Sequence, residues 1–135
     1  MGNINTVAAG LGDRLRTIEG LRVFDYVPDK VASPMAFVAW EDVQYHRAST
    51  NGLNEYGFTV TLVIGGRGSE RTAQRNLQNY VSDSGDLSIR AAIEGDRTLG
   101  GAAQDTVVVS AGDMIPLEVD GSFHLMVDLQ VTVYA

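Results

Sequence analysis

The sequence predicts an α+β fold, in which a mainly antiparallel sheet of four to five strands packs with an N-terminal helix and two central helices. Strand-like segments follow one another directly and are joined by turns that suit hairpins. Helix-like segments are grouped at the start and in the middle of the chain instead of alternating with the strands. The 135 residues, 44% hydrophobic and 20% charged, match one globular domain, so we take 1–135 as a single domain.

An amphipathic helix is expected at the start of the chain. Apolar residues recur there at spacings of four, four and three, which places them on one helical face: Val7, Leu11, Leu15 and Ile18. Asn3 or Asn5 can cap its first turn, because a short side-chain oxygen accepts hydrogen bonds from unpaired amides. Gly20 suits the left-handed residue that ends a helix.

Two strands are expected next, with an irregular connector between them. Leu21–Asp25 is a short strand candidate, and Tyr26–Pro34 holds two prolines, which cannot donate to a strand ladder. Met35–Trp40 is a nearly unbroken apolar run and predicts a buried strand. We expect four aromatic side chains from this and later segments to lie in the core: Phe37, Trp40, Phe58 and Phe123.

The polar segment from Gln44 to Asn54 is long for a hairpin loop, and long ordered loops in small domains are often contact surfaces. We therefore choose five of its residues as candidate contact residues: Tyr45, His46, Arg47, Asn51 and Asn54. Its neighbour Tyr56 begins the next strand, which alternates cleanly as far as Ile64.

Two helices are predicted after the glycines that end this strand. The first is capped by Ser69 and buries Ala73, Leu77, Tyr80 and Val81, while Arg71 and Arg75 lie on its opposite side. The second runs from Leu87 to Glu94, with Asp86 as its cap and Gly95 as its end. Residues 97–105 are small and polar, and we expect a mobile loop there.

The strongest strand signal ends the chain. Six apolar residues alternate there with polar ones: Phe123, Leu125, Val127, Leu129, Val131 and Val133. Asp120-Gly121 is a preferred hairpin turn and folds this strand back on Ile115–Val119. Thr106–Ser110 continues the same partner past a kink, and Pro116 indicates a bulge or an edge.

Charge and cysteine content exclude several classes of protein. Ten basic and 17 acidic residues give a net charge of −7, which argues against gripping nucleic acid through its phosphates. The absence of cysteine excludes disulfides, thiolate zinc sites and cysteine nucleophiles. No apolar run approaches the roughly 20 residues that span a bilayer, and no charged-then-apolar leader opens the chain.

No catalytic or metal-binding pattern emerges from the residues. The run Gly65 to Ser69 has the shape of an anion-binding turn, to which Arg67 and Arg71 could contribute, but it lacks the Walker lysine and the third glycine of a dinucleotide fingerprint. His46 and His124 have no partners at metal-ligand spacing. The neighbouring carboxylates Asp83/Asp86 and Glu94/Asp96 lie in turns and suit helix caps. We predict no enzyme, no metal and no cofactor.

The order of these elements resembles the tail terminator family of long-tailed bacteriophages. The likeness covers nearly the whole chain: the opening helix running into Leu21-Arg22-Val23-Phe24-Asp25-Tyr26-Val27-Pro28, the strand around Pro34-Met35-Ala36-Phe37-Val38, the polar loop, the strand Phe58 to Ile64, the helix rich in Arg and Gln, and Asp120-Gly121 before the last strand.

This resemblance implies a structural virion protein of the tail and neck, assembled in the host cytoplasm. It would form a homo-oligomeric ring, usually of six copies, that caps the tail tube, stops tube polymerisation and joins the tail to the head connector. Its partners would be itself, the tail-tube protein and the head–tail connector protein, with DNA only as cargo passing through the lumen and with no membrane contact. A lumen without strong positive charge lets DNA slide. We expect Arg67, Arg71 and Arg75 to join the loop residues at interfaces.

Three other functions remain open at this point. A neck-region head–tail connector or stopper protein shares the assembly logic and differs in the particle layer it binds. A small monomeric ligand-binding domain would use the anion-friendly turn at Gly65 to Ser69, and gel filtration distinguishes it as a monomer. A small hydrolase would need ionisable groups with perturbed pKa values clustered in a pocket.

Overall fold

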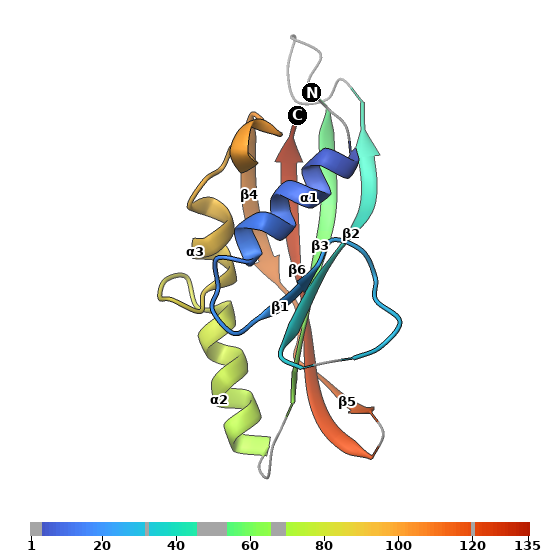
Figure 1. Ribbon diagram of the computed structural model, residues 1–135, viewed down its shortest axis with the longest axis vertical. Helices are drawn as coiled ribbons and strands as arrows, with labels where there is room; N and C mark the ends of the chain where they lie inside the picture. Colours follow the sequence, from blue (N-terminus) through green and yellow to red (C-terminus); the bar gives the residue numbers. More distant parts are fainter. Residues whose placement is uncertain (1–3, 32, 46–53, 66–69, 120) are drawn as a thin grey trace.

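The computed structural model describes residues 4–31, 33–45, 54–65, 70–119 and 121–135. The described elements, in chain order, are α1 (Ile4–Leu15), β1 (Arg22–Phe24), β2 (Met35–Gln44), β3 (Glu55–Gly65), α2 (Glu70–Val81), α3 (Ile89–Glu94), the 3₁₀ turn η1 (Leu99–Gly101), β4 (Asp105–Ala111), β5 (Ile115–Val119) and β6 (Ser122–Tyr134). The α+β class predicted from the sequence is confirmed (Figure 1).

The strands form one sheet in the order β1-β2-β3-β6-β4, with β5 also paired to β6. All pairs are antiparallel except β1 and β2, which run parallel. The sheet of the described chain therefore has six strands, where the sequence predicted four to five. The difference arises at β4 and β5, because the segment expected to be one interrupted partner of β6 forms two separate strands.

The longest pairing joins β3 to β6 and runs from Glu55 opposite Tyr134 to Gly65 opposite His124. The alternation predicted for β6 is confirmed, since five of its six apolar positions are buried: Leu125, Val127, Leu129, Val131 and Val133. Phe123 is half-buried and only packs against the core. Gly121 has a φ of 80°, as the predicted hairpin turn requires, while Asp120 lies outside the described residues.

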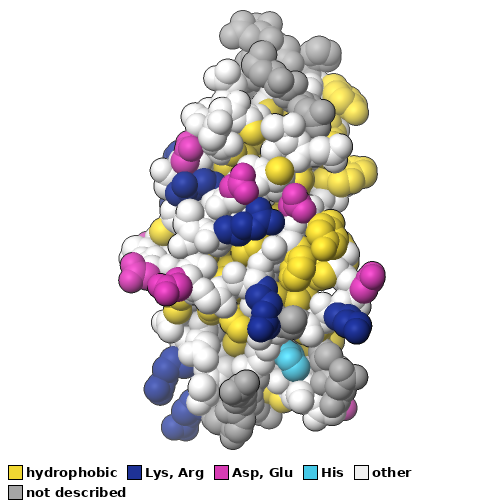
Figure 2. Space-filling view, in the orientation of Figure 1, with side chains coloured by type: hydrophobic (Ala, Val, Ile, Leu, Met, Phe, Trp, Pro, Cys, Tyr) yellow, Lys and Arg dark blue, Asp and Glu magenta, His cyan; other side chains and the backbone are white. Residues whose placement is uncertain are grey.

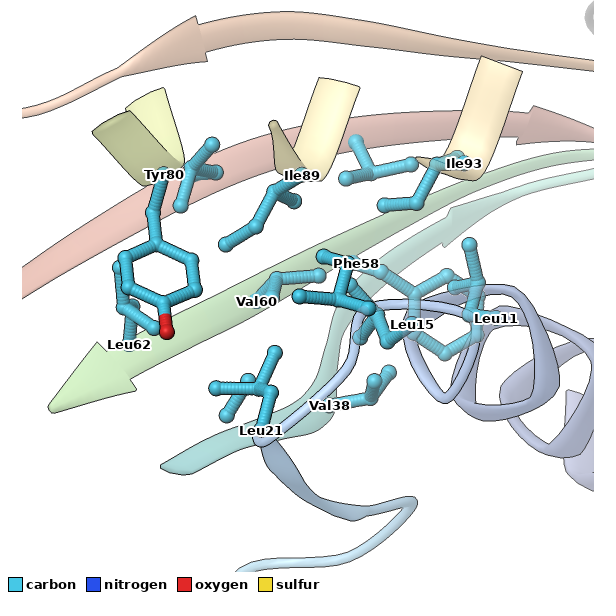
Figure 3. Close-up of a cluster of buried hydrophobic side chains, with 14 of the residues drawn as sticks. Leu11, Leu15, Leu21, Val38, Phe58, Val60, Leu62, Tyr80, Ile89 and Ile93 are labelled. Carbon is cyan, nitrogen blue, oxygen red and sulfur yellow. The ribbon is translucent and has the colours of Figure 1, made fainter. Parts of the chain in front are cut away.

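The hydrophobic core lies between one face of the sheet and the three α-helices. Figure 3 shows side chains of α1, α2 and α3 directed at those of β2 and β3. The residues labelled there are buried members of one cluster: Leu11, Leu15, Leu21, Val38, Phe58, Val60, Leu62, Tyr80, Ile89 and Ile93. On β3 the core residues recur at every second position, so all three helices cover the same face of the sheet.

The four residues that the periodicity selected are all buried, but the opening helix ends earlier than expected. α1 stops at Leu15, and Ile18 follows in a turn while remaining buried. Asn5 lies inside the helix and is not its cap, and Asn3 lies outside the described residues. Gly20 adopts a φ of 84° and ends the turn that leads to β1.

The central helices confirm the predicted buried faces and correct one cap. α2 buries Ala73, Leu77 and Tyr80, whereas Val81, which was also predicted to be buried, is half-buried and packs against the core. Asp86 does not cap α3, because Ser88 occupies the extended N-cap position and its Oγ accepts from the Ala91 amide at 3.1 Å. A buried hydroxyl so close to the first turn is the better acceptor.

The segment predicted to be a mobile loop, 97–105, is closed by its own contacts. The Arg97 guanidinium donates twice to Asp105, at 2.6 and 3.0 Å, and this hydrogen bonding lowers the pKa of Asp105. The Thr98 hydroxyl donates to Asp96, which lowers the pKa of Asp96, and Leu99 is buried beneath η1. Contacts local to the loop therefore hold its shape.

Candidate interaction surface

The core prediction was wrong for two aromatic residues of β2. Phe37 lies opposite Thr61, on the sheet face turned away from the helices, and is half-buried. Trp40 lies opposite Phe58 and so faces the helical layer, yet 60% of its surface is exposed. The reason is the limited reach of the helices. The first turns of α1 contribute Ile4, Asn5 and Ala8 to this part of the molecule, and they leave a hollow beside Trp40.

The hollow beside Trp40 has a volume of about 330 Å³ and is mainly apolar. Its wall is formed by residues from α1, β2, β3 and the connector after β1: Ile4, Asn5, Ala8, Asp25, Tyr26, Val27, Val38, Ala39, Trp40 and Phe58. Tyr26 and Val27 on its rim are 60% and 61% exposed. Figure 2 shows hydrophobic side chains gathered on this flank, at the right of the view. Exposed apolar patches on small domains are typical of contact surfaces.

The strand edge next to this hollow is open. β1 pairs with β2 only from Met35 to Phe37, and in the described part of the chain no strand pairs with that edge from Val38 to Gln44. Figure 1 shows this length of β2 as the right-hand border of the sheet. Unpaired backbone groups on such a border can pair with another chain.

A bulge at Glu41 turns two carboxylates toward the opposite face of the same border. The register shifts between Trp40 and Asp42, so Glu41 is the extra residue. Glu41 accepts a hydrogen bond from the Thr59 hydroxyl, and Asp42 lies over Gly57, where the missing Cβ leaves room for it. No described lysine or arginine forms an ion pair with either carboxylate. The open edge thus presents an indole on one face and two acidic groups on the other.

The face of the sheet turned away from the helices carries both polar and apolar residues, and Phe37, Val63 and Met126 are among the apolar ones. Thr59, Thr61 and Asp128 lie on it, and the Thr61 hydroxyl donates to the Asp128 carboxylate at 2.7 Å. Together with Glu41 and Asp42, these residues make this face hydroxyl-rich and acidic near the open edge.

The residues predicted as contacts fall into separate places. Tyr45 follows β2 and is 73% exposed, and Asn54 extends the sheet through two backbone hydrogen bonds with Ala135. Both are at the same end of the sheet as the open edge. Arg71 and Arg75 are exposed on α2, at the other end (Figure 1). Four of the predicted residues lie outside the described part of the chain: His46, Arg47, Asn51 and Arg67.

A second cleft, of about 390 Å³, separates α2 from the end of β3. Its lining is uncharged: Ser33, Pro34, Ile64, Gly65, Thr72, Asn76, Tyr80 and Leu87. Burial raises the pKa of Tyr80. The predicted anion-binding turn begins here at Gly65, but its residues 66–69 lie outside the described structure.

The ionisable groups serve structural contacts. Asp96 accepts from the amides of Thr98 and Gly100, while Glu94 accepts from the Val108 amide at 2.9 Å. Within the described ranges, no three His, Asp or Glu side chains are grouped so that they could hold a metal ion. No described helix is both long and apolar enough to cross a membrane.

No protein-family model matches this chain, and no curated protein matches it.

Sequence reasoning missed the surface around Trp40, Tyr26 and Val27. A signal was present, because the apolar run that contains Trp40 ends abruptly in Glu41-Asp42, and Tyr26-Val27 stands in a proline-containing connector that cannot be buried as a strand. An aromatic residue that stands next to acidic residues in the sequence can lie at the border of a core and need not lie at its centre.

Proposed function

We propose that this chain is a structural assembly protein that forms a ring, caps a phage tail tube, stops its polymerisation and joins the tail to the head connector. The observation that carries the proposal is the open edge of β2 with the exposed Trp40 hollow beside it. The order of elements that resembles the tail terminator family supplies the specific role. The surface supports the more general part, that the protein acts through contacts with other chains.

The two borders of the sheet support a head-to-tail contact. At the other border, β4, the Val108 amide is already bonded to the Glu94 carboxylate, so that border is partly closed. The two borders of the sheet, β2 and β4, are therefore different surfaces. Contacts between unlike surfaces repeat in one direction, and they close into a ring when the rotation per subunit allows it.

The carboxylates on the sheet face turned away from the helices support the passage of DNA. Glu41, Asp42 and Asp128 lie on this face, and they outnumber Arg22 of β1 on the same face. Each phosphate that a channel neutralises adds affinity through counterion release, so an acidic wall lets DNA move.

The proposal is tested by electron microscopy of virions assembled without this protein. Tails of uncontrolled length, detached from heads, are expected, and tails of normal length joined to heads would overturn it. A Trp40→Glu variant, which changes an exposed side chain, should fold and yet fail to restore tail length, whereas Glu19→Gln, an exposed change elsewhere, should restore it.

A head–tail connector or stopper role is the nearest alternative, and it predicts that the protein lies one layer away from the tube in the neck. A small ligand-binding function is favoured by one observation, the uncharged cleft lined by Thr72, Asn76 and Tyr80. That function predicts a monomer whose thermal stability rises with a small ligand, and whose removal leaves tail length unchanged.

A further inference from the structure

The outer side of α2 carries an unbalanced pair of positive charges. Arg71 and Arg75 are exposed and lie one helical turn apart, on the side opposite the buried Ala73 and Leu77. The helix contains one acidic residue, Glu70 at its first position, and neither arginine forms an ion pair with another described residue. The chain as a whole has a net charge of −7, so this helix differs from it in the sign of its charge.

The open edge of β2 is the complementary surface. Glu41 and Asp42 are both exposed and have no basic partner among the described residues, and they lie on the sheet face opposite Trp40. Carboxylates bind a guanidinium through short, charge-assisted hydrogen bonds. Arginine is also among the residues that most often dominate the energy of protein interfaces.

One molecule cannot join these two surfaces. Figure 1 shows α2 at the lower left and the free length of β2 at the upper right, and Figure 2 shows the basic side chains over α2 far from the hydrophobic flank. A contact between the surfaces must therefore join two molecules. Because the surfaces differ, each molecule can offer one of each and extend the assembly in one direction.

We propose that Arg71 and Arg75 of one copy dock on the open β2 edge of the next copy, where their guanidinium groups bind Glu41 and Asp42. This inference rests on the proposed self-assembly and names the two surfaces that meet. The matching charges favour a second copy over a partner of another kind. The contact places the α2 face of each subunit against the open edge of its neighbour.

Charge reversal of the purified full-length chain tests the contact. R71E/R75E and E41R/D42R each place like charges across it, so each variant alone should be monomeric in sedimentation velocity at concentrations where the unmodified chain associates. An equimolar mixture of the two should associate again, because both mixed contacts then pair opposite charges. The chain with all four substitutions should also associate. We expect each reversal to weaken association about tenfold or more, and salt to weaken the unmodified contact.

Matched controls separate this effect from net charge and from folding. Arg16→Glu alters the net charge as much as Arg75→Glu does, at an exposed residue of another surface, and should leave association unchanged. Arg71 and Arg75 are exposed and form no ion pair with a described residue, so the melting temperature of R71E/R75E should match that of the unmodified chain. E41R/D42R loses the Thr59 contact and should melt somewhat lower, with an unchanged circular dichroism spectrum. Reversed variants that associate as well as the unmodified chain, a mixture that stays monomeric, or an unmodified chain that never associates would each overturn the proposal.

The same variants distinguish failure of this contact from failure of the proposed function. If the mixture associates again but virions without the protein have normal tails, the contact is supported and the tail role is refuted. If those virions have tails of uncontrolled length but the variants still associate, the tail role is supported and the contact is refuted. Loss of binding to isolated tail tubes without loss of self-association would assign the arginine face to the tube protein and so overturn the proposal.

Discussion

Glu94→Ala is expected to destabilise the fold through the border of β4. One carboxylate oxygen of Glu94 accepts from the partly buried Val108 amide at 2.9 Å, and the other accepts from Arg90 Nε at 3.2 Å. The Glu94 side chain is only 17% exposed, whereas that of Arg90 is 51% exposed. The substitution therefore removes two contacts of unequal worth.

The expected magnitude follows from these two contacts. A hydrogen bond from a partly buried amide to a charged acceptor contributes about 1.5–3 kcal/mol to the free energy of unfolding. An exposed ion pair between residues four apart on a helix contributes only about 0.3–0.5 kcal/mol. Glu94→Ala should cost about 2–3 kcal/mol and Arg90→Ala less than about 1 kcal/mol. Glu94→Gln should fall between them, since an amide oxygen can still accept from Val108.

Urea unfolding of the three variants measures these differences, provided that the dependence on urea is the same for all. Hydrogen exchange adds a local measurement. The exchange rate of the Val108 amide should rise in Glu94→Ala and stay the same in Arg90→Ala. If Glu94→Ala lowers stability no more than Arg90→Ala does, the Val108 contact contributes nothing, and the border of β4 is not closed by Glu94.

Three further predictions concern other parts of the molecule. Gly10→Ala should destabilise the protein by about 1–3 kcal/mol in the same urea assay, because the new Cβ would lie 2.9 Å from Leu99 Cβ. Gly12→Ala has no neighbour nearer than 3.3 Å and should be neutral or stabilising, since alanine has the better helix propensity. The pKa of Asp96 is lowered in the folded state, so its contribution to stability is complete above the ordinary pKa and is lost as the pH falls through the folded pKa. Asp96→Asn should therefore reduce the fall in melting temperature below about pH 4. An unchanged dependence of melting temperature on pH in this range would refute the stabilising role of Asp96. Trp40 is the single tryptophan, so fluorescence of the monomer should report an exposed indole and shift to the blue on self-association, and an unshifted spectrum in the oligomer would exclude Trp40 from the contact.

Local patterns predicted most elements correctly. The alternation in Phe58 to Ile64 and in Leu125 to Val133 predicted β3 and β6, and the spacing of Val7, Leu11 and Leu15 predicted the buried face of α1. These patterns suffice because a residue period determines which side chains share a face, whatever the neighbouring elements are. The α3 cap was assigned to the wrong residue because Asp86 and Ser88 are both good caps, and only the turn of the chain decides which one reaches the free amides.

The candidate surface was less accessible to prediction. Tyr45 and Asn54 were chosen from the composition of a loop, and they do lie at the open end of the sheet. Trp40 was assigned to the core because it belongs to the nearly unbroken apolar run Met35–Trp40. How far a helix extends over a strand is a property of the packed layers, so the sequence around Trp40 does not contain it.

The order and amphipathic faces of the elements, the absence of cysteine and the acidic balance were determined by the sequence alone, because each depends on a residue and its near neighbours. The parallel pairing of β1 with β2, its end at Phe37 and the exposure of Trp40 were decided only in the tertiary structure. Those features depend on where segments distant in the chain stop covering one another. Where one segment ceases to cover another depends on how all the apolar faces pack together into a single core.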